Sequence, residues 1–128
     1  MTLTITALYA GLAGLLYLFL SIHVIKQRIA CHQSLGDGGD ALLSRRIRAH
    51  GNFSEYAPLT LILIAAFEAQ GGAAPLVHLA GIVLLVSRAL HAYGMQREGQ
   101  EWGRKYGILS CFALLLALSL ADIVMALT

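Results

Sequence analysis

Charged side chains are scarce in this sequence. Only 12% of the 128 residues are Asp, Glu, Lys or Arg, whereas a soluble globular domain typically carries about 25%. Hydrophobic residues make up 58% of the chain. This composition excludes an ordinary soluble domain and indicates a protein that lies in a membrane.

Cysteine and net charge are also low. The two cysteines, Cys31 and Cys111, are 80 positions apart and belong to different predicted segments, so we predict no disulfide. No set of His, Cys and acidic residues has the spacing of metal ligands, and we expect no metal. A net charge of +2, without basic residues interleaved with aromatic ones, argues against a nucleic-acid partner.

Long apolar runs are the dominant feature of the chain. A hydrocarbon core of about 30 Å is crossed by about 20 helical residues. Backbone groups in lipid must be satisfied within a helix or a closed barrel, and no barrel-type alternation is present. We therefore predict one all-α domain over residues 1–128, a left-handed bundle of four transmembrane helices at about residues 3–25, 42–69, 75–94 and 107–127.

The first apolar run, residues 3–25, has no Lys or Arg before it. It is also longer than the apolar region of a secretory signal. We expect it to be a retained helix rather than a cleaved signal.

The nine cations are confined to two of the three connections. The first connection is flanked by Lys26, Arg28, Arg45, Arg46 and Arg48, and the third by Arg88, Arg97, Arg104 and Lys105. Cytoplasmic loops carry the excess of Lys and Arg. We expect loops one and three in the cytoplasm and both termini on the opposite side, with Arg45 and Arg46 snorkelling as interfacial anchors.

A polar motif opens the second helix. Arg48, Asn52 and Glu55 are spaced i, i+4 and i+7, so on a helix they share one face. A cation, an amide and a carboxylate on one face can grip a small zwitterionic ligand. Pro58 follows and is expected to bend the helix.

The stretch Arg48 to Leu59, read as R-A-H-G-N-F-S-E-Y-A-P-L, resembles the helix-two signature of the MAPEG family. These are membrane-associated proteins in eicosanoid and glutathione metabolism, which include microsomal glutathione transferases and small bacterial members. The resemblance extends to residues 24–28, 36–38 and 88–94. It implies a homotrimer of four-helix protomers with glutathione bound between neighbouring subunits near the cytoplasmic face.

The resemblance also implies a set of site residues. Arg104 is the nearest match to the arginine that stabilises the glutathione thiolate, and Arg28 matches an arginine that reaches the ligand from the adjacent subunit. The residues expected to bind glutathione are Arg28, Arg48, His50, Asn52, Glu55, Tyr56, Arg88, His91 and Tyr93. Some catalytic members carry tyrosines where this chain has His91 and Met95, a pattern closer to the small bacterial branch.

We therefore expect a multi-pass protein of a bacterial inner membrane. Its expected activity is that of a glutathione-dependent transferase or peroxidase that uses glutathione as co-substrate against lipophilic small molecules. Two alternatives stay open: a small proton-coupled multidrug transporter that uses Glu55, and a non-catalytic trimeric scaffold. We also expect Arg88 to pair with Glu55 or Asp122, and Glu68 to be solvated.

Overall fold

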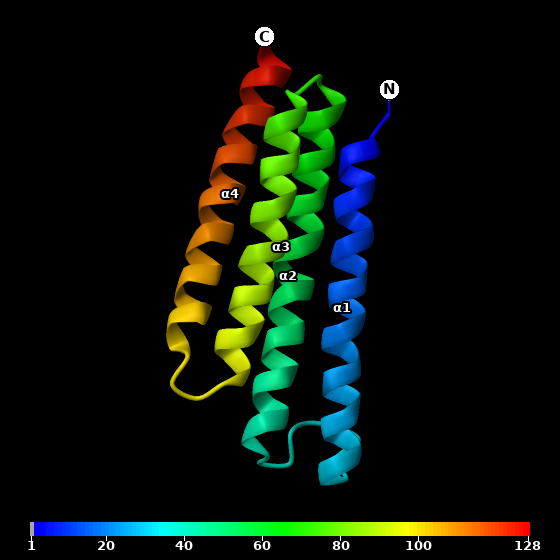
Figure 1. Ribbon diagram of the computed structural model, residues 1–128, viewed down its shortest axis with the longest axis vertical. Coiled ribbons are helices and arrows are strands. Elements are labelled where there is room, and N and C mark those ends of the chain that lie inside the picture. The colour runs from blue at the N-terminus through cyan, green and yellow to red at the C-terminus, as the bar shows by residue number, and fades with distance from the viewer. Residues whose placement is uncertain (1) are drawn as a thin grey trace.

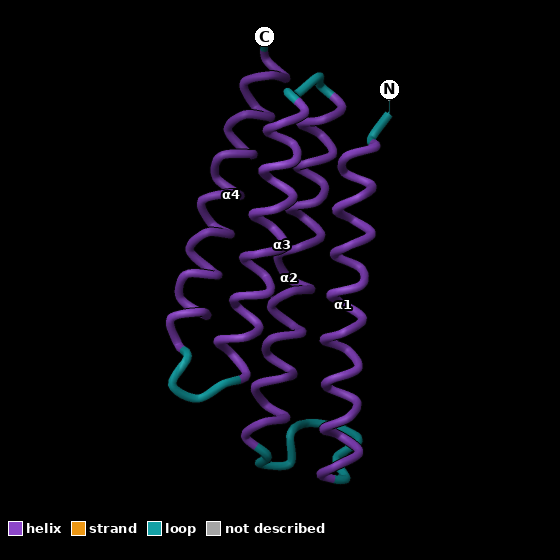
Figure 2. Tube along the Cα trace, in the orientation of Figure 1, coloured by secondary structure: helices purple, strands orange, loops and turns teal. Residues whose placement is uncertain are grey.

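The computed structural model describes residues 2–128, almost all of which are helical (Figure 2). The chain forms four helices and, within the described residues, no strand. The helices are α1 (Thr4–Cys31), α2 (Ala41–Ala69), α3 (Ala74–Gln96) and α4 (Glu101–Leu127). The all-α prediction is confirmed.

Two helices extend beyond the apolar runs that predicted them. Helix α1 continues past Ile25 to Cys31, and α4 begins at Glu101 rather than near residue 107. Hydropathy marks only the part of a helix that can lie in hydrocarbon, whereas the backbone remains helical until a residue breaks it. In α1 that residue is His32, whose left-handed conformation (φ 55°) ends the helix.

The four helices are arranged so that α2 and α3 lie between α1 and α4 (Figure 1). Helix α1 packs against α2 and α3, and α4 packs against the same two helices. The termini and the α2–α3 turn lie at one end of the bundle, and the α1–α2 and α3–α4 loops lie at the other (Figure 1). We call the latter the loop end; it carries the cation-rich connections.

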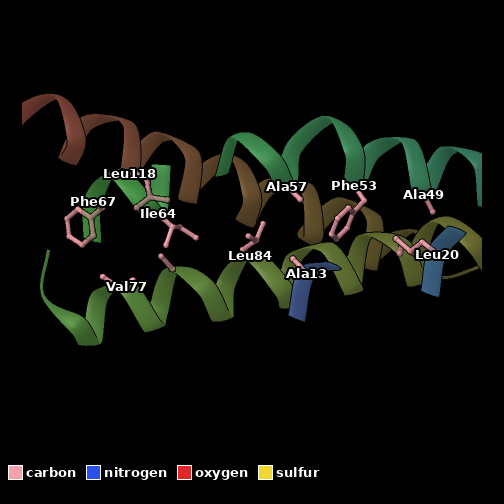
Figure 3. Packing of buried hydrophobic residues seen from close by; sticks show 12 residues of the cluster. Ala13, Leu20, Ala49, Phe53, Ala57, Ile64, Phe67, Val77, Leu84 and Leu118 are labelled. Carbon is pink, nitrogen blue, oxygen red and sulfur yellow. The ribbon is translucent and has the colours of Figure 1, made fainter. Parts of the chain in front are cut away.

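A row of apolar side chains fills the space between the helices (Figure 3). Leu20, Phe53, Ile64, Leu84 and Leu118 are among its members, and all are buried. Large apolar side chains also cover the outer faces of the helices. A surface of this kind matches lipid rather than water.

By length and composition, three of the described helices, α1, α3 and α4, are able to cross a membrane. Helix α2 is as long as these, but its first half carries several charged residues. Because α2 lies alongside the other helices (Figure 1), we retain the prediction that it is the fourth span.

The start of α1 is held by the end of α2. No side chain of α1 caps its own first turn. Instead, the Glu68 carboxylate accepts hydrogen bonds from the Ile5 amide (3.0 Å), the Thr6 amide (2.8 Å) and the Thr6 hydroxyl (2.6 Å). The expectation that Glu68 is solvated was wrong, because the free N–H groups of a helix start attract a carboxylate.

Helices α3 and α4 approach closely at glycines near the loop end. A Cβ atom on Gly107 would lie 2.6 Å from the His91 backbone nitrogen and 2.7 Å from the Ser87 carbonyl oxygen. A Cβ on Gly103 would lie 2.9 Å from the Leu90 carbonyl oxygen. The absence of side chains at these positions therefore sets the distance between the two helices.

We predict that Gly107→Ala destabilises the fold by about 1–3 kcal/mol, because the added methyl group overpacks against the backbone of α3. The measurement is the midpoint of thermal unfolding, followed by circular dichroism in detergent micelles. Gly11→Ala is the matched control, since a Cβ on Gly11 meets nothing within 4 Å. Equal midpoints for the two variants would contradict the prediction.

Candidate functional site

A buried arginine joins three helices near the loop end. Arg88 of α3 is only 2% exposed. Its Nη1 donates to the Asn52 side-chain oxygen on α2, and its Nη2 donates to the Gly107 carbonyl oxygen on α4 (3.2 Å). Its guanidinium carbon also lies 5.5 Å from the centre of the Tyr56 ring. Arg88 thus fixes α2 and α4 relative to α3.

The expectation that Arg88 pairs with Glu55 or Asp122 was wrong. Within residues 2–128 the ion pairs are Arg45–Glu98 and Arg48–Glu55, and Asp122 instead accepts a hydrogen bond from Gln70 (3.3 Å). Arg88 is satisfied by neutral amide and carbonyl oxygens, except for its Nε, which is buried without a partner. Its charge therefore stays uncancelled inside the bundle.

The charged part of the helix-two motif faces outward. Arg48 Nη1 and Glu55 Oε1 are 3.6 Å apart, and both side chains are 54% exposed. Asn52, between them in sequence, is 9% exposed and turned toward Arg88. The three residues that spacing places on one face therefore differ in exposure. Arg48 and Glu55 are accessible, whereas Asn52 is buried and bonded to Arg88.

Three arginines lie near His91 of α3. The His91 ring is buried, and the charges of Arg88, Arg104 and Arg48 all lie within electrostatic range of it. Arg104 itself is exposed at the start of α4. Three guanidinium groups around His91, one of them paired with Glu55, make this region suited to an anionic or zwitterionic ligand.

Tyr56 and Phe112 complete the region between α2 and α4. Their ring centres are 5.6 Å apart, and Phe112 is 46% exposed. Sequence reasoning identified Tyr56 but missed Phe112 and the Gly107 carbonyl group. The Gly103 and Gly107 pair, four residues apart, was a signal for close helix packing that could have located the carbonyl.

His50 and Arg28 make their contacts elsewhere in the chain. The His50 ring stacks on Tyr17 of α1 with a centre distance of 4.7 Å, and its Nε2 is 3.0 Å from Ser21 Oγ. Arg28 Nη1 donates to the carbonyl oxygens of Gln33 (3.2 Å) and Gly36 (2.8 Å) in the first loop. Among the described residues, neither His50 nor Arg28 forms a hydrogen bond or ion pair with Arg48 or Glu55.

Tyr93 also lies apart from this pair. Its ring centre is 6.2 Å from that of Trp102, and the Arg97 guanidinium carbon lies 5.1 Å from it. Tyr93 is therefore part of the exposed loop-end surface of α3.

The first loop has its own acidic turn. The Gly39 amide donates to Asp37 Oδ1 (3.0 Å), and this hydrogen bond, with one from the Ser44 side chain, lowers the pKa of Asp37. Asp37 is therefore ionised near neutral pH. Within residues 2–128, His, Cys, Asp and Glu side chains form no group of three that could hold a metal ion.

The sequence is similar to one known family and to bacterial inner membrane proteins. The family model described as MAPEG family matches residues 6–124. The chain is also 37% identical over 119 residues to "Inner membrane protein YecN" of Escherichia coli K12, an alignment that covers 93% of this chain and 90% of that protein. The protein of the same name from Escherichia coli O6:H1 matches equally well.

We predict that Arg88→Met lowers the free energy of unfolding by about 2–4 kcal/mol, because it leaves the buried Asn52 side-chain oxygen without a donor and removes the link from α3 to the Gly107 carbonyl oxygen of α4. Thermal unfolding in detergent micelles measures the change. Arg97→Met is the control and is expected to stay within about 0.5 kcal/mol, since Arg97 is exposed and makes no ion pair among the described residues. A similar loss in both variants would show that Arg88 does not join the helices.

Proposed function

Because this chain belongs to the MAPEG family and is a membrane protein, we propose that it binds glutathione and activates its thiol against lipophilic electrophiles. The observation that supports the proposal best is the accessible Arg48–Glu55 pair. Between the two charged residues in sequence, the buried Asn52 contacts Arg88 and holds α2 in position against α3.

Each polar group of the motif suits a group of glutathione. The Arg48 guanidinium offers forked, charge-assisted hydrogen bonds to a carboxylate, and the Glu55 carboxylate suits the ammonium group. At 3.6 Å the two side chains form only a loose pair with each other, so a zwitterionic ligand can replace it at little cost. Asn52 uses its oxygen for Arg88, which leaves its N–H groups for a peptide carbonyl.

Arg104 is the residue we assign to the thiol. The thiolate is the nucleophile, and a free thiol has a pKa of roughly 8.5. A guanidinium beside the sulfur favours the ionised form, and the proton leaves to solvent. The thiolate then forms a carbon–sulfur bond with the electrophile, whose leaving group departs with its electron pair. Phe112 offers an exposed apolar surface near Tyr56 for the second substrate.

The geometry gives less support to the transporter alternative. A proton-coupled transporter needs a carboxylate isolated near the bilayer centre, whereas Glu55 is half-exposed beside Arg48. The second alternative is a non-catalytic trimeric scaffold, in which the polar residues of α2 only hold subunits together. Binding of glutathione to the purified protein distinguishes this scaffold from the proposed enzyme.

We further propose that the site is completed in a homotrimer, as the family resemblance implies. Arg28 would reach the ligand from an adjacent protomer, which fits its position at the loop end, away from the Arg48–Glu55 pair of its own protomer. We also propose that the loop end faces the cytoplasm, because the cations gather there.

For the orientation, we predict that a fusion of alkaline phosphatase to the C-terminus is enzymatically active in bacterial cells. A fusion of green fluorescent protein at the same position should be dark, because the C-terminus would lie outside the cytoplasm. The matched control inserts each reporter into the first loop, where the pattern should reverse. A fluorescent C-terminal fusion would overturn the proposed sidedness.

For the activity, we predict that adding glutathione to the purified protein in detergent micelles produces an ultraviolet thiolate band. Arg104→Ala should remove the band while leaving glutathione affinity, measured by calorimetric titration, within about threefold, since the carboxylate and ammonium contacts remain. Lys105→Ala is the neighbouring control and should keep the band. Absence of both heat and thiolate in the unmodified protein would rule out the proposed function.

A further inference from the structure

A second polar groove lies on the other side of α2 from the Arg48–Glu55 pair. It has a volume of about 360 Å³ and lies between α1 and the last turns of α3. Its polar lining is formed by His23, Arg46, Tyr93, Gln96 and Arg97. Arg46 and Arg48 are two residues apart, and a helix turns about 100° per residue. Their side chains therefore leave α2 in nearly opposite directions, and the groove is separate from the proposed glutathione site.

Arg46 is held inside this groove. Its Nη1 donates to the His23 carbonyl oxygen (3.1 Å) and to Gln27 Oε1 (3.4 Å), both on α1. Arg46 is therefore tied to α1, whereas Arg45 is partly exposed and paired with Glu98 (2.8 Å). That both act as interfacial anchors stays a prediction.

One edge of the Arg46 guanidinium remains unused. Its Nε is buried and has no partner, and no residue within the described chain accepts from its Nη2. Nε and Nη2 form the parallel pair of donors that binds two oxygens of one phosphate or carboxylate group. No acid within residues 2–128 forms an ion pair with Arg46. The partly buried Arg46 guanidinium therefore has two free donors, Nε and Nη2, and no anionic partner among the described residues.

The rest of the groove indicates what kind of anion fits. Arg97 adds a second cation without an acidic partner among the described residues. Away from the cations, the lining is apolar and includes Leu16, Leu20 and Ala89. Leu16 and His23 are seven residues apart on α1, which corresponds to about 10 Å along the helix. The groove thus has a cationic end and an apolar strip that continues toward the bilayer interior.

We propose that this groove binds an anionic phospholipid, with its phosphate ester on Arg46 and Arg97 and one acyl chain along Leu16 and Leu20. Basic pockets between transmembrane helices at the cytoplasmic surface suit lipid headgroups. The bound lipid supplies the anion that Arg46 lacks and covers the gap between α1 and α3. This role is independent of glutathione binding.

The test is native mass spectrometry of the full-length protein in detergent micelles, titrated with dioleoylphosphatidylglycerol or dioleoylphosphatidylcholine. The anionic lipid should bind at least about tenfold more tightly than the zwitterionic one, and Arg46→Gln should weaken it by about tenfold through loss of the charged fork. Arg45→Gln is the matched control, with the same charge change one residue away, and should stay within about twofold.

A further variant keeps the proposal testable if Arg46→Gln does not fold, as judged by circular dichroism. Ala89 is exposed on the groove floor, so Ala89→Phe blocks the acyl chain without changing any charge and should also weaken binding of the anionic lipid.

Four results would overturn the proposal. Equal affinity for the two lipids, or equal losses in Arg45→Gln and Arg46→Gln, would show only diffuse attraction to charge. Displacement of the lipid by inorganic phosphate alone would assign the groove to a free anion. Displacement by glutathione would make the groove part of the glutathione site.

Discussion

The charge of Arg88 constrains the whole loop end of the bundle. A guanidinium that is almost fully buried in an apolar protein is costly unless its donors find acceptors. Here the acceptors are the Asn52 amide and the Gly107 carbonyl. The carbonyl is within reach because α4 approaches α3 at a residue without a side chain. Arg48 and Glu55, on the same helix face as Asn52, remain accessible, while Asn52 is held against Arg88. One buried contact thereby holds in position the helix that carries the accessible charges of the proposed site.

The two sides of helix α2 have different surroundings at the loop end. Its outward face carries the Arg48–Glu55 pair, whereas Arg46 points into the groove against α1. Both features lie at the cation-rich loop end, yet the helical twist separates them. This separation keeps the proposed glutathione site and the proposed lipid groove apart, although neighbouring residues of α2 contribute to both. It also explains why three arginines within four positions, Arg45, Arg46 and Arg48, have three different environments.

Much of the fold was predictable from hydropathy, and much of the site was not. Helices α1, α3 and α4 follow from apolar runs of membrane-spanning length, because a backbone in lipid has few alternatives. Helix ends outside the hydrocarbon were missed at Cys31 and Glu101, since hydropathy does not register polar helical turns. Spacing correctly grouped Arg48 with Glu55. The spacing did not show that Asn52 is buried, because its burial depends on a hydrogen bond from Arg88 of α3.

The sequence by itself determined the helical class, the clustering of cations in two connections and membership of a family. Each of these depends on local composition or on motifs read along one segment. The tertiary structure alone decided which oxygens satisfy Arg88, that Glu68 caps α1, and that one edge of Arg46 is free. These outcomes depend on the distance and rotation between helices, which are set by the packing of residues far apart in the chain. The order of residues in the sequence does not directly specify these distances and rotations.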